Sequence, residues 1–235
     1  METDAHKVPP AVLLLEGKSI RDTSSARLYQ ISRAVTTLPW APPKNSSVIF
    51  ERVEDNAHER ARHLFYLAHP ADAQYRTDIP AYYITSVDTE TVGNVHFKTS
   101  KRRLQKTEFT ALLSAKRTAS HRPLFNKAGE LSTLFNARPT SWRSSHYCWT
   151  DSDGHQVAFE DRESEQHKLV ITQPMLQETR DALAGVWVLR LWYEAAESRQ
   201  AKKEALERMM PPVPYQDMTL AKRVGALGAL GGAGG

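Results

Sequence analysis

The feature that most constrains this sequence is an apolar stretch near its C-terminus, in Gln177–Ser198. Between Met175 and Met210 there is no proline and only one glycine, so the segment is predicted to be one helix. A helix that is apolar on every face is either buried in protein or inserted in a membrane. Apolar side chains point all round the predicted helix: Leu183, Val186, Trp187, Val188, Leu189, Leu191 and Trp192.

The length of this stretch decides between the two environments. A bilayer span takes about 20 apolar residues, whereas the run between Ala182 and Tyr193 is shorter and is interrupted by Arg190. We therefore expect the rest of the chain to surround the helix. A β-barrel with the helix through its middle supplies such an environment. The residues predicted to form this core are Leu183, Val186, Trp187, Leu191 and Trp192.

The chain before the helix is predicted to form many short strands. β-Branched and aromatic runs alternate with clusters of Gly, Pro, Ser, Asp and Asn, and this spacing is typical of a sandwich or a barrel. Residues 18–26 are predicted to be a turn. The predicted strands cover 11–17, 27–35, 47–53, 63–69, 80–87, 91–99, 107–115, two short strands around Gly129, a hairpin in 146–161, and 167–173.

The 235 residues suit one large domain. We expect a flexible tail over 1–10, a barrel with its central helix over 11–210, and a disordered tail over 211–235 that is rich in Pro and then in Gly and Ala.

The start of the chain and its cysteine content bear on the compartment. The apolar run Ala11–Leu15 is too short for a secretory signal. A single cysteine, Cys148, excludes an internal disulfide and is typical of a reducing compartment. We therefore expect an intracellular, cytoplasmic protein without a transmembrane span, with the nucleus or the membrane periphery as alternatives.

One segment is strongly basic although the whole chain carries a formal charge of only +4. From Lys98 to Lys127 there are nine basic residues and one acid, Glu108, which leaves the rest of the chain net acidic. Such a segment can hold anionic lipid headgroups, attract nucleic acid, or form a solvated face that keeps strand edges apart. The candidate residues for an anionic ligand are Lys98, Lys101, Arg102, Arg103, Lys106, Lys116 and Arg117.

The sequence offers weak signals for catalysis or for a metal. His58 and His63 are five residues apart, about 140° around a helix, so they do not share one metal-binding face. Cys148 and His146 share a strand face, but a buried cysteine that packs as a small apolar residue explains the pattern. Asp151–Gly154 is a hairpin turn and has too few ligands for a calcium loop. We predict no catalytic residue, no metal and no cofactor.

Several segments resemble a known family. They are "VLLLEGKSIRDTSSARLYQISRAV", "PAYYITS", "VGNVHF", "KLVITQPM" and "LAGVWVLRLWYEA". With the predicted strands and helix, the chain resembles the tubby C-terminal-like superfamily over about 11–197, and is similar to a group of its fungal members. Phospholipid scramblases and plant LURP-one-related proteins belong to this superfamily. The resemblance implies a mainly β fold, a closed barrel of about twelve strands around a central hydrophobic C-terminal helix.

The resemblance does not identify binding or catalytic residues in this chain. Scramblases carry clusters of cysteines and a membrane-inserted helix, whereas this chain has one cysteine and no predicted span. No phosphoinositide-binding signature of tubby matches here. The function we expect is a non-enzymatic module that binds an anionic lipid headgroup, such as a phosphoinositide, or a protein partner. The alternatives are an enzyme with dispersed catalytic residues and a regulator that binds nucleic acid.

Overall fold

The computed structural model describes residues 7–36, 47–54, 60–70, 79–101, 106–141, 146–161 and 166–197. The chain divides into two units, Met1–Ala195 and Ala196–Gly235. Only Ala196 and Glu197 of the second unit are described, and they end a helix that belongs mainly to the first. The account below concerns the first unit.

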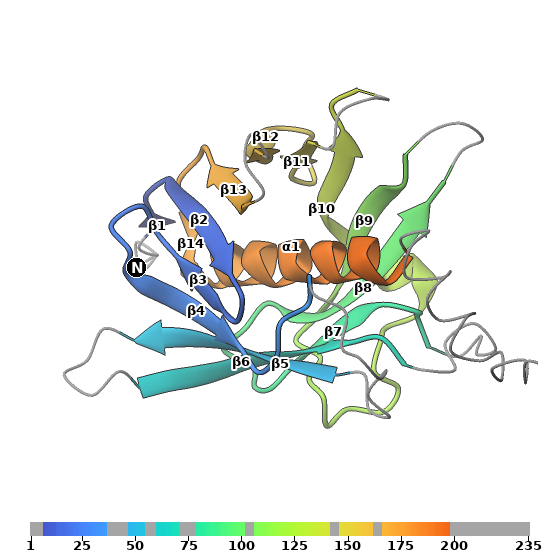
Figure 1. Cartoon of the computed structure of the whole chain (residues 1–235). Helices are drawn as coiled ribbons and strands as arrows, with labels where there is room; N and C mark the ends of the chain where they lie inside the picture. Colours follow the sequence, from blue (N-terminus) through green and yellow to red (C-terminus); the bar gives the residue numbers. More distant parts are fainter. Residues whose placement is uncertain are drawn as a thin grey trace, which may run out of the picture. The chain divides into compact units, whose positions relative to one another are not determined.

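Twelve strands form a closed antiparallel barrel (Figure 1), as predicted. Each strand from β2 to β13 pairs with the next one in the sequence, and β13 pairs with β2 to close the ring. The strands are β2 (Ala11–Glu16), β3 (Ser19–Arg21), β4 (Arg27–Ile31), β5 (Ser47–Glu54), β6 (Arg60–Ala68), β7 (Tyr83–Ser86), β8 (Gly93–Ser100), β9 (Glu108–Ala115), β10 (Ser132–Pro139), β11 (Tyr147–Thr150), β12 (Gln156–Asp161) and β13 (His167–Ile171).

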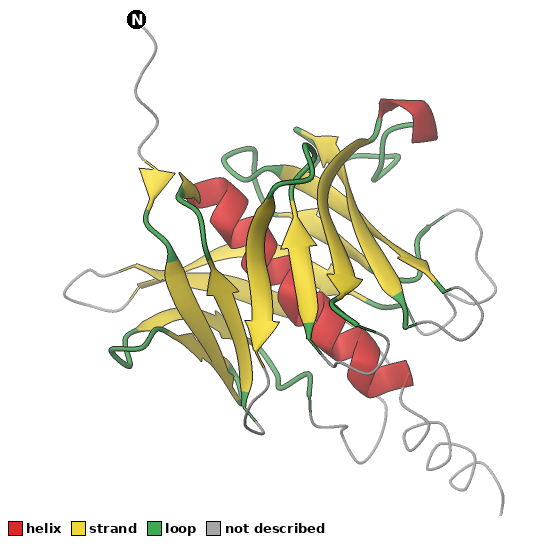
Figure 2. Cartoon of the chain, turned by 90° about the horizontal axis from the view of Figure 1, so that it is seen from above, coloured by secondary structure: helices red, strands yellow, loops and turns green. Residues whose placement is uncertain are grey.

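The helix α1 (Gln177–Glu197) runs through this barrel (Figures 1 and 2). Every residue from Arg180 to Trp192 is buried. Strands on different sides of the ring contact it: Tyr29 of β4 donates a hydrogen bond to Asp181, and Glu160 of β12 accepts one from Arg190. The buried residues include all five that were predicted as core: Leu183, Val186, Trp187, Leu191 and Trp192. The prediction of a central helix is therefore confirmed.

Two parts of the strand prediction are wrong. Residues 18–26 were predicted to be a turn, but Ser19–Arg21 forms β3, because Ile20 is fully buried among the inward side chains of the barrel. Two strands were predicted around Gly129, but only β10 forms there. It is preceded by a short 3₁₀ turn, Ala128–Glu130.

The ends of the predicted domain also differ from the structure in part. Lys7–Val8 forms β1 and pairs with β14 (Met175–Leu176), so this part of the predicted N-terminal tail belongs to a small two-stranded sheet. The helix begins at Gln177, directly after β14. Residues 1–6, the predicted helical residues 198–210 and the predicted tail 211–235 lie outside the described residues.

Within the described residues, no helix combines the length and the apolar character that crossing a membrane requires.

Candidate functional site

The barrel has two ends, which α1 distinguishes. We call the end where α1 begins the start end; it carries the turns β3–β4, β7–β8 and β11–β12 and the long β9–β10 connection. We call the opposite end the finish end; it carries the connections β2–β3, β8–β9 and β10–β11. Because neighbouring strands are antiparallel, successive connections alternate between the two ends.

The predicted basic site is divided between these ends. Lys98 is exposed on β8 opposite Thr110, and Lys101 follows β8 at the finish end. Lys106 precedes β9 at the same end, whereas Arg102 and Arg103 lie outside the described residues. Lys116 and Arg117 follow β9 at the start end. Since β8 and β9 each have eight residues, the two groups are about 24 Å apart along the strands.

The connection 116–131 folds back over the outer face of β7 and β8. The ring of Phe125 lies 5.6 Å from that of Tyr83 and 6.0 Å from that of His96, measured between centroids. Asn94 of β8 fastens the loop, because its Nδ2 donates hydrogen bonds to the carbonyl oxygens of Thr118 (3.1 Å) and Leu124 (2.7 Å). The basic side chains of the loop are thus carried on a well-bonded segment.

His96 lies against Phe125 of this loop and close to the exposed Lys98 on β8. The two side chains lie on the same face of β8, two residues apart. Burial, and secondarily the charge of Lys98, lower the pKa of His96. The imidazole is therefore neutral near pH 7 and adds no positive charge to this face.

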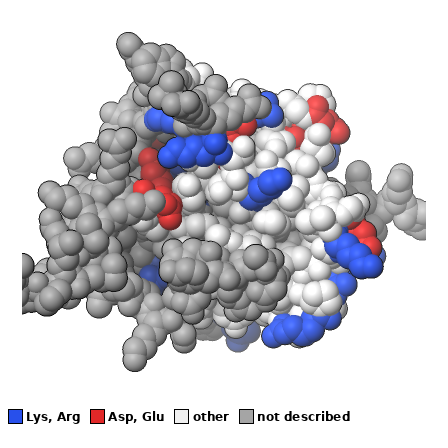
Figure 3. Space-filling model, turned by 90° about the vertical axis from the view of Figure 1, so that its right-hand side faces the viewer, with Lys and Arg blue, Asp and Glu red and all other residues white. Residues whose placement is uncertain are grey.

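Local bonds decide which basic groups are available to a ligand. The guanidinium of Arg117 donates to Asn126 Oδ1 (2.7 Å) and to the carbonyl oxygen of Pro123 (3.2 Å), so it holds the loop together. The one acid of the segment, Glu108, lies 3.9 Å from Arg138 of the neighbouring strand β10. Figure 3 looks onto the finish end, where basic side chains near the centre and along the lower edge have no acid of the described part of the chain beside them.

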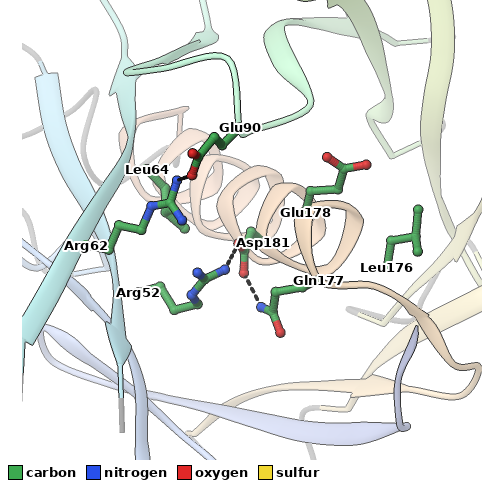
Figure 4. A pocket seen from close by; sticks show the side chains of 8 residues that line it. All are labelled: Arg52, Arg62, Leu64, Glu90, Leu176, Gln177, Glu178 and Asp181. Atoms are coloured by element: carbon green, nitrogen blue, oxygen red, sulfur yellow. Dashed lines mark hydrogen bonds and ion pairs between the residues drawn. The ribbon is translucent and has the colours of Figure 1, made fainter. Parts of the chain in front are cut away.

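A pocket of about 410 Å³ opens at the start end (Figure 4). Strands β5 and β6 contribute one wall and the first turn of α1 contributes the other. Its lining consists of Arg52, Arg62, Leu64, Glu90, Leu176, Gln177, Glu178 and Asp181.

Asp181 organises the deep part of this pocket. Its carboxylate accepts hydrogen bonds from the Tyr29 hydroxyl (2.9 Å), from Gln177 Nε2 (2.5 Å) and from Arg52 Nη1 (2.6 Å). Burial raises the pKa of Asp181, and the charge of Arg52 opposes that rise. Sequence reasoning missed this cluster, because Tyr29 and Asp181 are 152 positions apart.

A second polar cluster lies inside the barrel. Arg190 Nη2 is 2.5 Å from Glu160 Oε2, and Trp149 Nε1 donates to Glu160 Oε1 at 3.0 Å. The guanidinium of Arg190 also bonds to Glu194 (3.1 Å) and lies over the ring of Tyr147. Arg190 appears in the sequence as a mere interruption of an apolar run, but the structure gives both of its terminal guanidinium nitrogens a carboxylate partner, whereas its Nε has no acceptor among the described groups.

The other candidate residues have structural explanations. Cys148 is half-buried on β11, and burial raises the pKa of its thiol, which disfavours the thiolate that a nucleophile needs. The Nε2 atom of His63 on β6 lies 3.2 Å from the carbonyl oxygen of Phe65. His58, which was predicted not to share a metal-binding face with His63, and Glu59 lie outside the described residues.

The Asp151–His155 turn joins β11 to β12 as a hairpin, as predicted. Ligand atoms of Asp151, Asp153 and His155 lie within 4.8 Å of one another. Asp151 Oδ1, however, accepts the backbone N–H groups of Asp153 (3.0 Å) and His155 (2.8 Å). These bonds are those of an Asx turn, and they account for the conformation of the segment.

Comparison with known proteins gives no relative: no family model, no curated protein and no solved structure matches the chain.

Proposed function

We propose that this chain is a non-enzymatic binding module of the tubby C-terminal-like superfamily that acts inside the cell and holds an anionic lipid headgroup. Its ligand-binding surface is the tip of the β8–β9 hairpin at the finish end, which we call the basic tip: Lys98, Lys101, Arg102, Arg103 and Lys106. A barrel of twelve strands with a helix inside is the architecture that the resemblance implied, and this agreement supports the superfamily assignment.

The observation that carries the proposal is the placement of charge on this hairpin. Lys98 and Lys101 are exposed at the finish end, and the only acid in the segment, Glu108, faces Arg138 of β10. By sequence, the basic tip therefore has an excess of positive charge at the connection between β8 and β9. Each Lys or Arg close to an anionic membrane contributes about 1 kcal/mol to binding.

A lipid surface fits this arrangement better than a nucleic acid duplex does. A duplex presents phosphates along a track, so a protein that follows it needs cations along a comparable length. On β9, the outward positions between the two basic groups are held by uncharged residues, Thr110 and Leu112. A membrane, in contrast, needs only one protruding cluster. An acidic protein partner would use the same charges, and the experiment below separates it.

The test is co-sedimentation with vesicles of neutral lipid, with and without a phosphoinositide, over a range of salt concentrations. The wild type should sediment with the anionic vesicles at low salt and be released as salt rises, because exposed charges are screened within about 10 Å at 0.1 M. Replacing Lys101, Arg102 and Arg103 by Ala should abolish retention. Lys101 is exposed, and a change at an exposed position alters the free energy of unfolding by only about 0.5 kcal/mol.

A control variant removes the same charge elsewhere. Lys7, Arg60 and Lys127 are exposed residues of the described chain that lie outside the basic tip. Replacing these three by Gln should leave retention unchanged. Equal loss in both triple variants would mean that net charge alone drives the association. Absence of wild-type retention on every anionic vesicle would remove the lipid proposal, and tighter binding to duplex DNA or to an acidic protein would replace it.

A further inference from the structure

We propose that the pocket at the start end binds a small zwitterion: an amino acid or a short peptide with free amino and carboxyl ends. This inference rests on a different set of residues from the basic tip, at the opposite end of the barrel. The test of this inference is therefore independent of the test of the proposed function.

Two of the three acids that line the pocket, Asp181 and Glu90, are bonded to its two arginines, and the third, Glu178, lies apart from them. Figure 4 shows Arg52 and Arg62 together on the side of β5 and β6, and Glu178 on the side of α1, with the opening between them. A ligand that spans the opening thus meets guanidinium groups at one end and a carboxylate at the other. This is the complement of an ammonium and a carboxylate carried by one small molecule.

Both arginines are held in position by ion pairs that leave some of their N–H donors unbonded. Arg52 Nη1 is fixed by Asp181 at 2.6 Å, and Arg62 Nη2 is fixed by Glu90, with Asp88 at 3.4 Å. A guanidinium carries five N–H donors, and the bonds to other described side chains occupy only the terminal nitrogens. The remaining donors of Arg62 can form a fork with a ligand carboxylate, as arginines commonly do.

Glu178 supplies the opposite charge. Its carboxylate is exposed at the rim of the pocket and makes no ion pair or hydrogen bond with the described part of the chain. The two arginines and the three acids of the lining give a formal charge of −1, and this excess corresponds to Glu178. A simple anion would be repelled by Glu178, and a simple cation would leave the remaining N–H donors of the arginines without an acceptor. A zwitterion has a group for each.

Size and apolar surface agree with this ligand class. The volume of about 410 Å³ is near the lower end of the range for small-molecule pockets, about 300–1,000 Å³. Leu64 and Leu176 line the pocket beside the charged groups. Leu176, which is half-buried, offers an apolar contact for one aliphatic side chain, so we choose the dipeptide alanyl-leucine as the probe.

The experiment measures binding of three forms of this dipeptide by calorimetry: free at both ends, acetylated at the amino end, and amidated at the carboxyl end. A hydrogen bond to a charged group contributes about 1.5–3 kcal/mol, so each cap should weaken binding about tenfold or more. If only amidation of the carboxyl end weakened binding, the pocket would be an anion site. If only acetylation of the amino end weakened binding, it would be a cation site. Either result would overturn the proposal, as would no binding of the free dipeptide at about 10 mM.

Two variants assign the contacts. Glu178→Gln should lower the affinity for the free dipeptide to that for the acetylated one, so that acetylation no longer changes the affinity. Arg62→Gln should lower it to that for the amidated dipeptide, so that amidation no longer changes the affinity. The matched control is Glu130→Gln, an exposed carboxylate in the β9–β10 connection that does not line the pocket. It should leave all three affinities unchanged. Because Glu178 is exposed, its variant should fold normally, and an affinity unaltered by it would contradict the assignment.

Discussion

At the scale of single residues, Arg190 brings a full charge into the barrel interior. The ion pair with Glu160 is buried on both sides, with side-chain exposures of 2% and 7%. Taking two charges out of water is costly, and the cost is offset only where the remaining donors and acceptors are also bonded. Trp149 bonds to one carboxylate oxygen of Glu160 and Glu194 bonds to one terminal nitrogen of Arg190, whereas Arg190 Nε has no acceptor among the described groups. The pair therefore favours the observed rotation of α1, in which Arg190 reaches Glu160 on β12.

Stability should depend on pH through Glu160. Complete burial raises the pKa of Glu160 to about 7, from an ordinary value of 4.5. Between these two values the folded chain holds a proton on Glu160 that the unfolded chain has released, so the contact with Arg190 becomes a full ion pair only as the pH rises past about 7. The free energy of unfolding should therefore fall as pH rises from about 5 to about 7, with a limiting slope of about 1.4 kcal/mol per pH unit. Urea denaturation at several pH values in this window measures that slope.

Glu160→Gln is the comparison for this measurement. The variant lacks the titrating group, so its free energy of unfolding should vary less with pH than that of the wild type. Burial also raises the pKa of Asp181, which acts in the same direction and is present in both proteins. Parallel curves for the two proteins would show that Glu160 does not titrate in this range.

Trp187 tests whether the helix fills the barrel. Its side chain is fully buried, so Trp187→Ala should leave a cavity and lower the free energy of unfolding by about 3–5 kcal/mol. This is a large part of the ~5–15 kcal/mol that is typical of a domain. The indole Nε1–H is buried and has no acceptor among the described groups. Trp187→Phe, which removes that donor, should therefore cost less. An unchanged denaturation midpoint for the Ala variant would contradict the packing described here.

At the scale of elements, α1 faces strands β6 and β7 at Gly185, where there is room for one methyl group. A Cβ atom added there would lie 3.4 Å from Ile84 Cδ1 and 3.5 Å from Phe65 Cδ2, which are ordinary contact distances. Alanine is more favourable than glycine inside a helix by about 1 kcal/mol. Gly185→Ala should therefore raise the denaturation midpoint slightly. A fall would show that β6 and β7 are packed too rigidly against the helix to accept one methyl group.

Gly93, at the start of β8, should respond in the opposite way. Its φ of +117° is strained for other residues, and an added Cβ would lie 2.5 Å from the carbonyl oxygen of Ser114 on β9. Gly93→Ala should lower the free energy of unfolding by at least about 1–3 kcal/mol, because backbone strain and the clash add together. Thermal denaturation of both glycine variants and of the wild type tests the two predictions. A melting temperature of Gly93→Ala equal to that of the wild type would contradict the prediction for Gly93.

At the scale of the whole molecule, the strands and the helix depend on each other. The twelve strands precede α1 in the sequence, yet their inward side chains pack on it. A chain that ends at Pro174 should therefore show no cooperative thermal transition and should bind a dye for exposed apolar surface, as loosely packed states do. Adding a peptide of residues 175–197 should restore the transition. Cooperative unfolding of the shortened chain alone would show that the barrel closes without its helix.

The sequence by itself determined the class of fold. An apolar run that faces all directions needs a protein environment on every side, and a closed barrel of strands supplies one. The five predicted core residues of the helix are therefore buried, whereas the burial of Arg180, Asp181 and Arg190 was not predicted. Local patterns were less reliable where a single side chain decided the outcome, as Ile20 did by drawing Ser19–Arg21 into the ring.

Only the tertiary structure decided which polar groups meet. Asp181 bonds to Tyr29 and Arg52, and Arg190 bonds to Glu160. The closure of the barrel and the rotation of the helix decide these pairs. Neither can be inferred from the spacing of residues in the sequence. The basic run shows the converse. It is continuous in sequence, but two antiparallel strands of eight residues carry its two halves to opposite ends of the barrel. Proximity along the chain and proximity in space differ here because an extended strand moves the chain about 3.4 Å per residue.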